Sequence, residues 1–148
     1  MAPIPEVKRS SLVKPTTQTR FHIDFTWWGE KDRDWRVYLQ SLLCPDHQAA
    51  FAELPEDKQV DFVDPISAEV QQVDGLQHVL ISHCARETGF ITTHTTMVDA
   101  VFRTFLANGN TPMTPTELAG QLNRPPDLIL RTLTGERVYR GLRPIAEP

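Results

Sequence analysis

Long apolar runs are missing from this sequence of 148 residues. No stretch approaches the roughly 20 apolar residues that a membrane-spanning helix needs. Residues 1–15 also lack the apolar run of about 7–15 residues that a secretory signal carries. We therefore expect a cytoplasmic protein without a membrane partner.

Cysteine is scarce, and the common catalytic motifs are absent. Cys44 and Cys84 are too few for a disulfide framework, so we expect thiols or metal ligands. The sequence contains none of the patterns G-x-x-x-x-G-K-[ST], G-x-G-x-x-G, H-E-x-x-H and G-x-S-x-G. We predict that the protein is not an enzyme. A nucleophilic Cys84 with His83 or His78 as its base stays open, because such partners meet in space rather than in sequence.

Charged residues are present in ordinary number but are unevenly distributed. Hydrophobic residues make up 40% and charged residues 23% of the chain, which is typical of a globular protein of one domain or two very small ones. Residues 1–20 hold four basic residues against one acidic, residues 21–112 six against fourteen, and residues 113–148 five against four. The net charge of −4 thus combines basic ends with an acidic middle, which argues against indiscriminate coating of nucleic acid.

The N-terminal half predicts a strand, helices and a hairpin. Residues 1–15 contain three prolines and little periodicity, which indicates a disordered tail. Apolar and polar residues alternate over residues 20–28, the period of a half-buried strand, before Gly29 and Glu30 end the pattern. Helical spacing of apolar residues follows over 35–43 and more briefly over 47–54. Residues 59–74 then contain two alternating runs around Asp64 and Pro65, which predicts a β-hairpin.

The C-terminal half predicts helices. Apolar stripes at helical spacing cover residues 76–84 and 97–106. Thr114, Pro115 and Glu117 combine an N-cap, a proline at the first helical position and a capping-box glutamate. This helix is predicted to end at Asn123, which tolerates the left-handed conformation of a sharp turn. A second short helix is predicted over residues 126–133.

The segment TPTELAGQLNRPPDLILRTL resembles the helix-turn-helix superfamily of DNA-binding modules. The resemblance covers about 20 residues, or about 50 if the helix over 95–106 completes a trihelical core. It implies that Ala119 allows a close helix crossing and that the second helix enters the major groove. A following strand or wing would turn arginines toward phosphates. The residues expected to contact DNA are Arg124, Asp127, Arg131, Thr132, Arg137, Arg140 and Arg143.

A metal site is a further hypothesis. Cys44 and His47 have a spacing that one tetrahedral zinc ion can bridge, and His83 and Cys84 offer two more ligands. Adjacent residues on a helix diverge by about 100°, so His83 and Cys84 can both bind only where their helix ends or bends. The alternative is that both cysteines are small buried core residues.

Together these patterns predict an α+β protein. A disordered tail over 1–15 precedes an α+β unit over 16–92, made of a strand, a helix and a β-hairpin, and this unit packs against a helix-turn-helix module over 93–148 that ends in a short strand or wing. The expected function is DNA binding as a transcriptional regulator. The alternative is a non-enzymatic adaptor or assembly subunit that docks protein with the same helices. A homodimer or a protein partner is left open, and no cofactor is expected other than a structural zinc ion.

Overall fold

The computed structural model describes residues 14–51, 59–63, 66–135 and 137–145. Its helices are α2 (Phe25–Lys31), α3 (Trp35–Ser41), α4 (Pro45–Phe51), α5 (Gly75–Ser82), the 3-10 helix η1 (Cys84–Arg86), α6 (Met97–Ala107), α7 (Pro115–Leu122) and α8 (Pro126–Leu133). Its strands are β1 (Phe21–Ile23), β2 (Gln59–Val63), β3 (Val70–Asp74) and β4 (Leu142–Pro144). Helices with two small antiparallel sheets confirm the α+β class.

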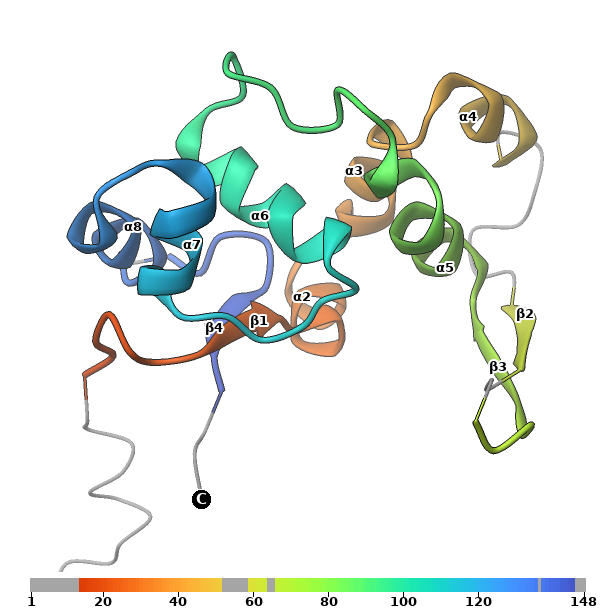
Figure 1. Ribbon diagram of the computed structural model, residues 1–148. Coiled ribbons are helices and arrows are strands. Elements are labelled where there is room, and N and C mark those ends of the chain that lie inside the picture. The colour runs from red at the N-terminus through yellow and green to blue at the C-terminus, as the bar shows by residue number, and fades with distance from the viewer. Residues whose placement is uncertain (1–13, 52–58, 64–65, 136, 146–148) are drawn as a thin grey trace, which may run out of the picture.

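Helix α6 lies at the centre of the molecule, between α7 and α8 on one side and α3 and α5 on the other (Figure 1). It is apolar around most of its circumference, which is typical of a central helix. Its buried residues are Ala100, Val101, Phe102, Thr104, Phe105 and Leu106. The one polar member, Thr104, donates its hydroxyl hydrogen to the carbonyl oxygen of Ala100, so burial leaves no unpaired hydroxyl.

One cluster of buried side chains joins the two halves of the chain. Around Phe102 it collects an aromatic group in which Trp28 contacts Trp35, Tyr38 and Phe102 in edge-to-face geometry. The same cluster includes Leu39 and Leu80 from before residue 92 and residues of α6, α7, α8 and β4 from after it. The expected units 16–92 and 93–148 therefore share one hydrophobic core.

The sheet of β1 and β4 connects the two ends of the described chain. The strands are antiparallel, with Phe21 opposite Pro144 and Ile23 opposite Leu142. Phe21 also forms a bridge to Met113, so β1 lies between β4 and the segment that precedes α7. Gly141, just before β4, has φ of +80°, and a Cβ there would lie 2.9 Å from the Asp24 carbonyl oxygen. Only glycine allows this close approach.

The predicted strand over residues 20–28 is correct only for its first half. The chain leaves the strand after Ile23 because the Asp24 carboxylate accepts a hydrogen bond from the backbone N–H of Trp27 and caps α2. Gly29 and Glu30, expected to end a strand, lie inside this helix. As a consequence Trp28, rather than Trp27, points into the core.

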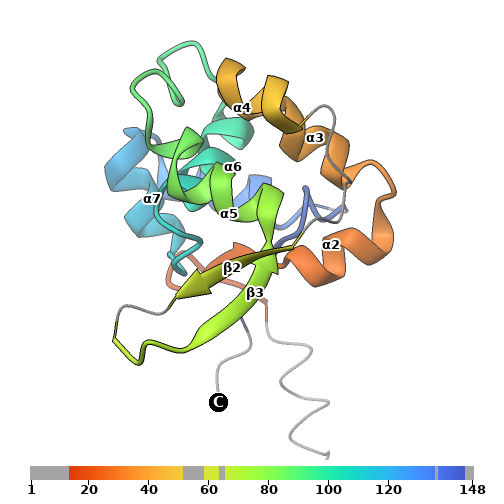
Figure 2. The same ribbon diagram turned by 90° about the vertical axis from the view of Figure 1, so that its right-hand side faces the viewer.

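The hairpin predicted over residues 59–74 is confirmed. Its strands β2 and β3 pair with Gln59 opposite Asp74 and Val63 opposite Val70. It extends away from the helices (Figure 2). Val63 and Val70 are 55% and 63% exposed, so its tip adds little to the core. The expected turn residues 64–65 lie outside the described part of the chain.

The other predicted helices are present, but their first and last residues differ from the predicted ones. The helix expected over 47–54 starts at Pro45, and residues 52–58 are outside the described ranges, as are residues 1–13 of the expected tail. Within the described residues, no helix combines the length and the apolar character that crossing a membrane requires.

Candidate functional site

The helix pair α7–α8 has the local geometry that its sequence predicts. The Thr114 hydroxyl accepts a hydrogen bond from the N–H of Glu117, whose carboxylate accepts one from the N–H of Thr114, so the capping box is complete. Asn123 has φ of 56° and ψ of 48° and ends α7 in the left-handed conformation. Pro126 begins α8 after a turn of three residues, 123–125.

Helices α6, α7 and α8, the helical trio, pack by their apolar faces. Leu118 and Ala119 of α7 and Ile129 and Leu133 of α8 are buried. Ala119, the residue that the resemblance places at the helix crossing, is buried in the shared core. The opposite face of α8 is turned outward and carries Asp127, Leu128 and Arg131, all exposed.

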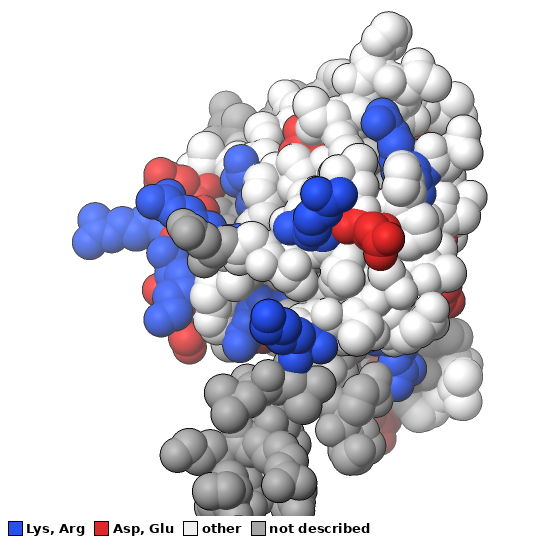
Figure 3. All heavy atoms as spheres, turned by 90° about the vertical axis from the view of Figure 1, so that its left-hand side faces the viewer, with Lys and Arg blue, Asp and Glu red and all other residues white. Residues whose placement is uncertain are grey.

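Five of the seven residues expected to contact DNA lie in the turn before α8, on α8 or in the segment after it. Arg124 in the turn and Arg137 after α8 are exposed, as are Asp127 and Arg131. Thr132 is half-buried, and its hydroxyl donates to the carbonyl oxygen of Leu128 at 2.9 Å. Figure 3 shows this side of the molecule, with Lys and Arg side chains spread over it and fewer acidic ones between them.

Arg140 and Arg143, the other two residues expected to contact DNA, are half-buried and interact with the protein itself. The Arg140 guanidinium lies 3.4 Å from the centre of the Tyr38 ring, and its Nε is buried without a hydrogen-bond partner among the described residues. Arg143 pairs with the Asp24 carboxylate at 3.1 Å and stacks over Trp27. These contacts of Arg140 and Arg143 stabilise the position of the C-terminal segment beside β1.

The segment between α8 and β4 is held against α6. The Tyr139 hydroxyl donates a hydrogen bond to the carboxylate of Asp99. Burial raises the pKa of Tyr139, and the bond to Asp99 raises it further. The short strand or wing expected after the second helix is the strand β4, Leu142–Pro144. In the described ranges one strand, not a two-stranded wing, follows α8.

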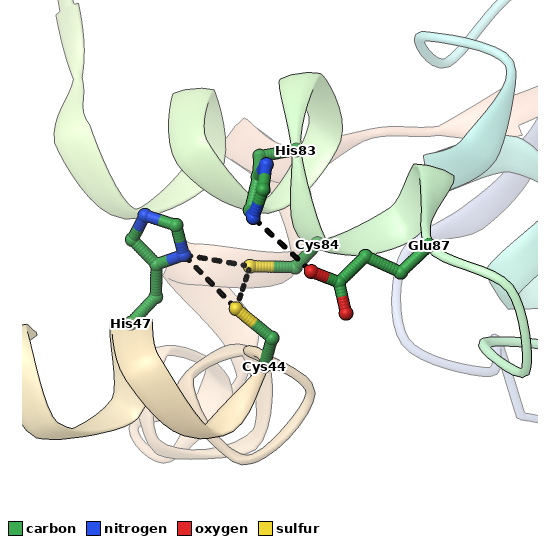
Figure 4. A network of polar contacts seen from close by, with 5 residues as sticks. All are labelled: Cys44, His47, His83, Cys84 and Glu87. Carbon is green, nitrogen blue, oxygen red and sulfur yellow. Dashed lines mark hydrogen bonds and ion pairs between the residues drawn. The ribbon is translucent and has the colours of Figure 1, made fainter.

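The four predicted metal ligands lie close together in the structure and form what we call the cysteine–histidine cluster: Cys44, His47, His83 and Cys84. Cys44 lies just before α4, His47 is on its first turn, and Cys84 begins η1 (Figure 4). The Cys44 sulfur lies 3.0 Å from Nδ1 of His47 and 3.5 Å from the Cys84 sulfur, and the Cys84 sulfur lies 3.6 Å from the same Nδ1. Three atoms that can bind a metal ion thus converge from two segments that are far apart in sequence.

His83 lies at the same cluster because helix α5 ends there. It is the C-cap residue of α5, with φ of −132° and ψ of −65°, so it and Cys84 are not consecutive residues of one regular helix. The rings of His47 and His83 are 4.6 Å apart. Nε2 of His83 contacts a carboxylate oxygen of Glu87 at 3.1 Å. Sequence reasoning missed Glu87, whose only signal was its position four residues after His83.

The environment of Cys84 does not favour nucleophilic catalysis. Burial raises the pKa of its thiol to about 11, with a smaller contribution from the hydrogen bond to the Cys44 side chain. A protonated thiol is a weak nucleophile. His78, the other base considered, is on α5, whereas the nitrogen that contacts the Cys84 sulfur belongs to His47.

The chain was compared with known proteins, and no protein-family model, curated protein or solved structure matches it. The helical trio and the cluster of Cys44, His47, His83 and Cys84 are the two features of the described residues that bear on function.

Proposed function

We propose that this protein binds DNA with α8 in the major groove and acts as a transcriptional regulator. The observation that carries the proposal is the outward face of α8, which presents Arg131, while its inner face is fixed in the core. Two further exposed arginines, Arg124 and Arg137, lie in the segments before and after this helix. A helix of eight residues is about 12 Å long, comparable to the width of the major groove.

The exposed residues divide into two roles. Arg131 is in the last turn of α8 and has the donor geometry for a guanine edge, while Asp127, one turn earlier, is an acceptor suited to a cytosine amino group. Arg124 and Arg137 lie at opposite ends of α8 in sequence and serve as phosphate contacts. Thr132 is a weaker candidate because its hydroxyl hydrogen is already donated to the backbone.

Two phosphate contacts, from Arg124 and Arg137, set a modest scale for the electrostatic contribution. They give a slope of about −2 in the logarithm of the binding constant against the logarithm of salt concentration. Such a module binds weakly alone, so a homodimer on two half-sites one helical turn apart is the arrangement that reaches useful affinity.

The test is fluorescence anisotropy with a random pool of labelled duplexes, followed by the site selected from that pool, at two salt concentrations. Arg131→Ala should weaken binding to the selected site by about 1–3 kcal/mol and flatten the preference among sites. Arg137→Ala should weaken binding to all duplexes alike and reduce the salt slope by about one unit.

Arg33→Ala is the matched control, because Arg33 is exposed between α2 and α3 and its removal changes the net charge by the same amount. It should bind like the unchanged protein. Binding without salt dependence, or equal losses in Arg131→Ala and Arg33→Ala, would refute the proposal.

The second candidate function is protein docking. Leu128, 37% exposed on the outward face of α8, favours it because an apolar side chain has no role at a phosphate. Leu128→Ser should then abolish capture of a partner by the full chain, whereas Arg137→Ala should leave that capture nearly unchanged.

A further inference from the structure

We propose that Cys44, His47, Cys84 and His83 bind one zinc ion, which holds α4 to the end of α5. This site is separate from the proposed DNA interface, since α4 and α8 lie at opposite sides of the molecule (Figure 1).

The separations of three donor atoms match a tetrahedral site. With Zn–S bonds of about 2.3 Å and Zn–N bonds of about 2.0–2.1 Å, tetrahedral angles place two sulfurs about 3.8 Å apart and a sulfur and a nitrogen about 3.6 Å apart. The observed separations are 3.5 Å between the sulfurs and 3.0 and 3.6 Å between each sulfur and Nδ1 of His47. One ion can therefore contact all three atoms with small movements of the side chains.

His83 is the residue placed to supply the fourth ligand. A ring nitrogen of His83 and a carboxylate oxygen of Glu87 lie with the Cys44 sulfur in a group whose atoms are all within 4.8 Å of one another. The His83 side chain is 52% exposed, so its ring has room to turn toward the sulfurs. Glu87, which contacts Nε2 of His83 at 3.1 Å, is a carboxylate of the kind that usually orients a zinc-bound histidine.

Two thiolates and two imidazoles select zinc among the common divalent ions. Mg²⁺ and Ca²⁺ prefer oxygen ligands, and a tetrahedral site with two sulfurs and two nitrogens is typical of structural zinc. Four protein ligands close the coordination sphere and leave no position for a water molecule. The expected role is therefore structural rather than catalytic.

The sparse packing of α4 against the core is the reason why such a site would stabilise this helix. Helix α4 has no buried residue, and only Phe51 at its end packs partly against the core. A helix of seven residues is too short to be stable by itself. A metal ion bound by Cys44 and His47 on one side and by His83 and Cys84 on the other supplies the connection that apolar packing does not.

The ion also has a route to the site. A pocket of about 270 Å³ reaches the cluster, and its lining includes Cys44, Pro45, Cys84 and Glu87. Neither cysteine is in a disulfide.

The experiment uses the full chain, purified without chelators and assayed for bound metal, then titrated with Co²⁺ after metal removal. We expect close to one equivalent of zinc. Co²⁺ should produce the visible bands of tetrahedral coordination and the near-ultraviolet band of sulfur-to-cobalt charge transfer. Metal removal should increase amide hydrogen exchange over residues 45–51 and leave α6 protected.

Single variants then test the ligand set. His47→Ala should lower zinc affinity at least 100-fold, because loss of even an outer partner costs about 10–100-fold. His83→Ala should lower it by more than Glu87→Gln, which should cost about tenfold. His94→Ala is the matched control, since His94 is an exposed histidine in the turn before α6, and it should bind zinc normally.

Circular dichroism on each metal-free variant separates loss of binding from loss of folding. Substoichiometric zinc with no Co²⁺ charge-transfer band in folded protein would overturn the proposal. So would a Cys44–Cys84 disulfide, detected as two thiols that resist alkylation until reduced. A larger loss in Glu87→Gln than in His83→Ala would overturn the assignment of the fourth ligand.

Discussion

The helical trio and the region formed by α4 and the β2–β3 hairpin differ in how much of their surface they bury. In α6, six of the eleven residues are buried, and α7 and α8 each present an apolar face to it. Helix α4 buries none of its seven residues, and the hairpin exposes Val63 and Val70. The comparison shows that elements of similar length in one chain are stabilised by different means.

The trio gains its stability from the hydrophobic effect, which grows with the apolar area removed from water. The second region depends on specific contacts instead. The Arg36 guanidinium on α3 pairs with Asp74 at the end of β3, both only 14% exposed, and the cysteine–histidine cluster lies at the start of α4. Side-chain truncations should therefore have large effects in the first region and small effects in the second.

The largest effect is expected at the centre of the trio. Phe102→Ala removes a fully buried ring that contacts Trp28, Tyr38 and Tyr139, and should lower the free energy of unfolding by about 3–5 kcal/mol. Phe51→Ala, the same change at a half-buried residue at the end of α4, should cost less than about half as much. Urea unfolding of both variants measures the difference. Equal losses would show that α4 packs as firmly as α6.

An intermediate effect is expected where α7 crosses its neighbours. Ala119→Leu adds volume at a buried position and should lower the free energy of unfolding by about 1–3 kcal/mol. Gly120→Ala, one residue further along, is the control: nothing lies within 4 Å of the added Cβ. It should stabilise the protein by about 0.4–1 kcal/mol. Thermal unfolding compares the two, and an unchanged midpoint in Ala119→Leu would argue against the close crossing.

The smallest effect is expected in the hairpin. Val70 is 63% exposed and lies opposite Val63, so Val70→Thr keeps a β-branched side chain and changes little buried area. The free energy of unfolding should change by no more than about 0.5 kcal/mol. A loss above 1 kcal/mol in the same urea assay would reveal packing on this strand that its exposure does not suggest.

Structure set by neighbouring residues was predictable from the sequence. The capping box at Thr114 and Glu117 and the left-handed turn at Asn123 involve atoms within a few positions of one another, so the residue types alone specify them. The hairpin was predictable for the same reason, because its two runs are separated by a short turn.

Structure that depends on contacts between distant residues was not predictable from the sequence. The alternation over residues 20–28 indicated a strand, but the core needed the ring of Trp28 beside Phe102, which a helix capped by Asp24 provides. The alternating arginines after α8 suggested a phosphate-binding face. Arg140 lies on the ring of Tyr38, about a hundred residues earlier, and no local pattern signals that contact.

The cysteine–histidine cluster was only partly predictable from the sequence. The residue types and the spacing of Cys44 and His47 were informative, and the condition that α5 must end near His83 is met. The convergence of the two segments and the presence of Glu87 follow from the packing of α3 and α4 near α5, which the sequence alone did not specify.

The pairing of β1 with β4 has a consequence for the order in which the protein folds during synthesis. Asp24 and Arg143, bonded beside this sheet, are 119 positions apart. At a translation rate of about 5–20 residues per second, β1 leaves the ribosome many seconds before its partner strand exists. During that interval an edge of β1 has unpaired N–H and C=O groups, a template for association with other chains. Closing a loop of this length costs about 4 kcal/mol of chain entropy, so the helices between must fold first to shorten it.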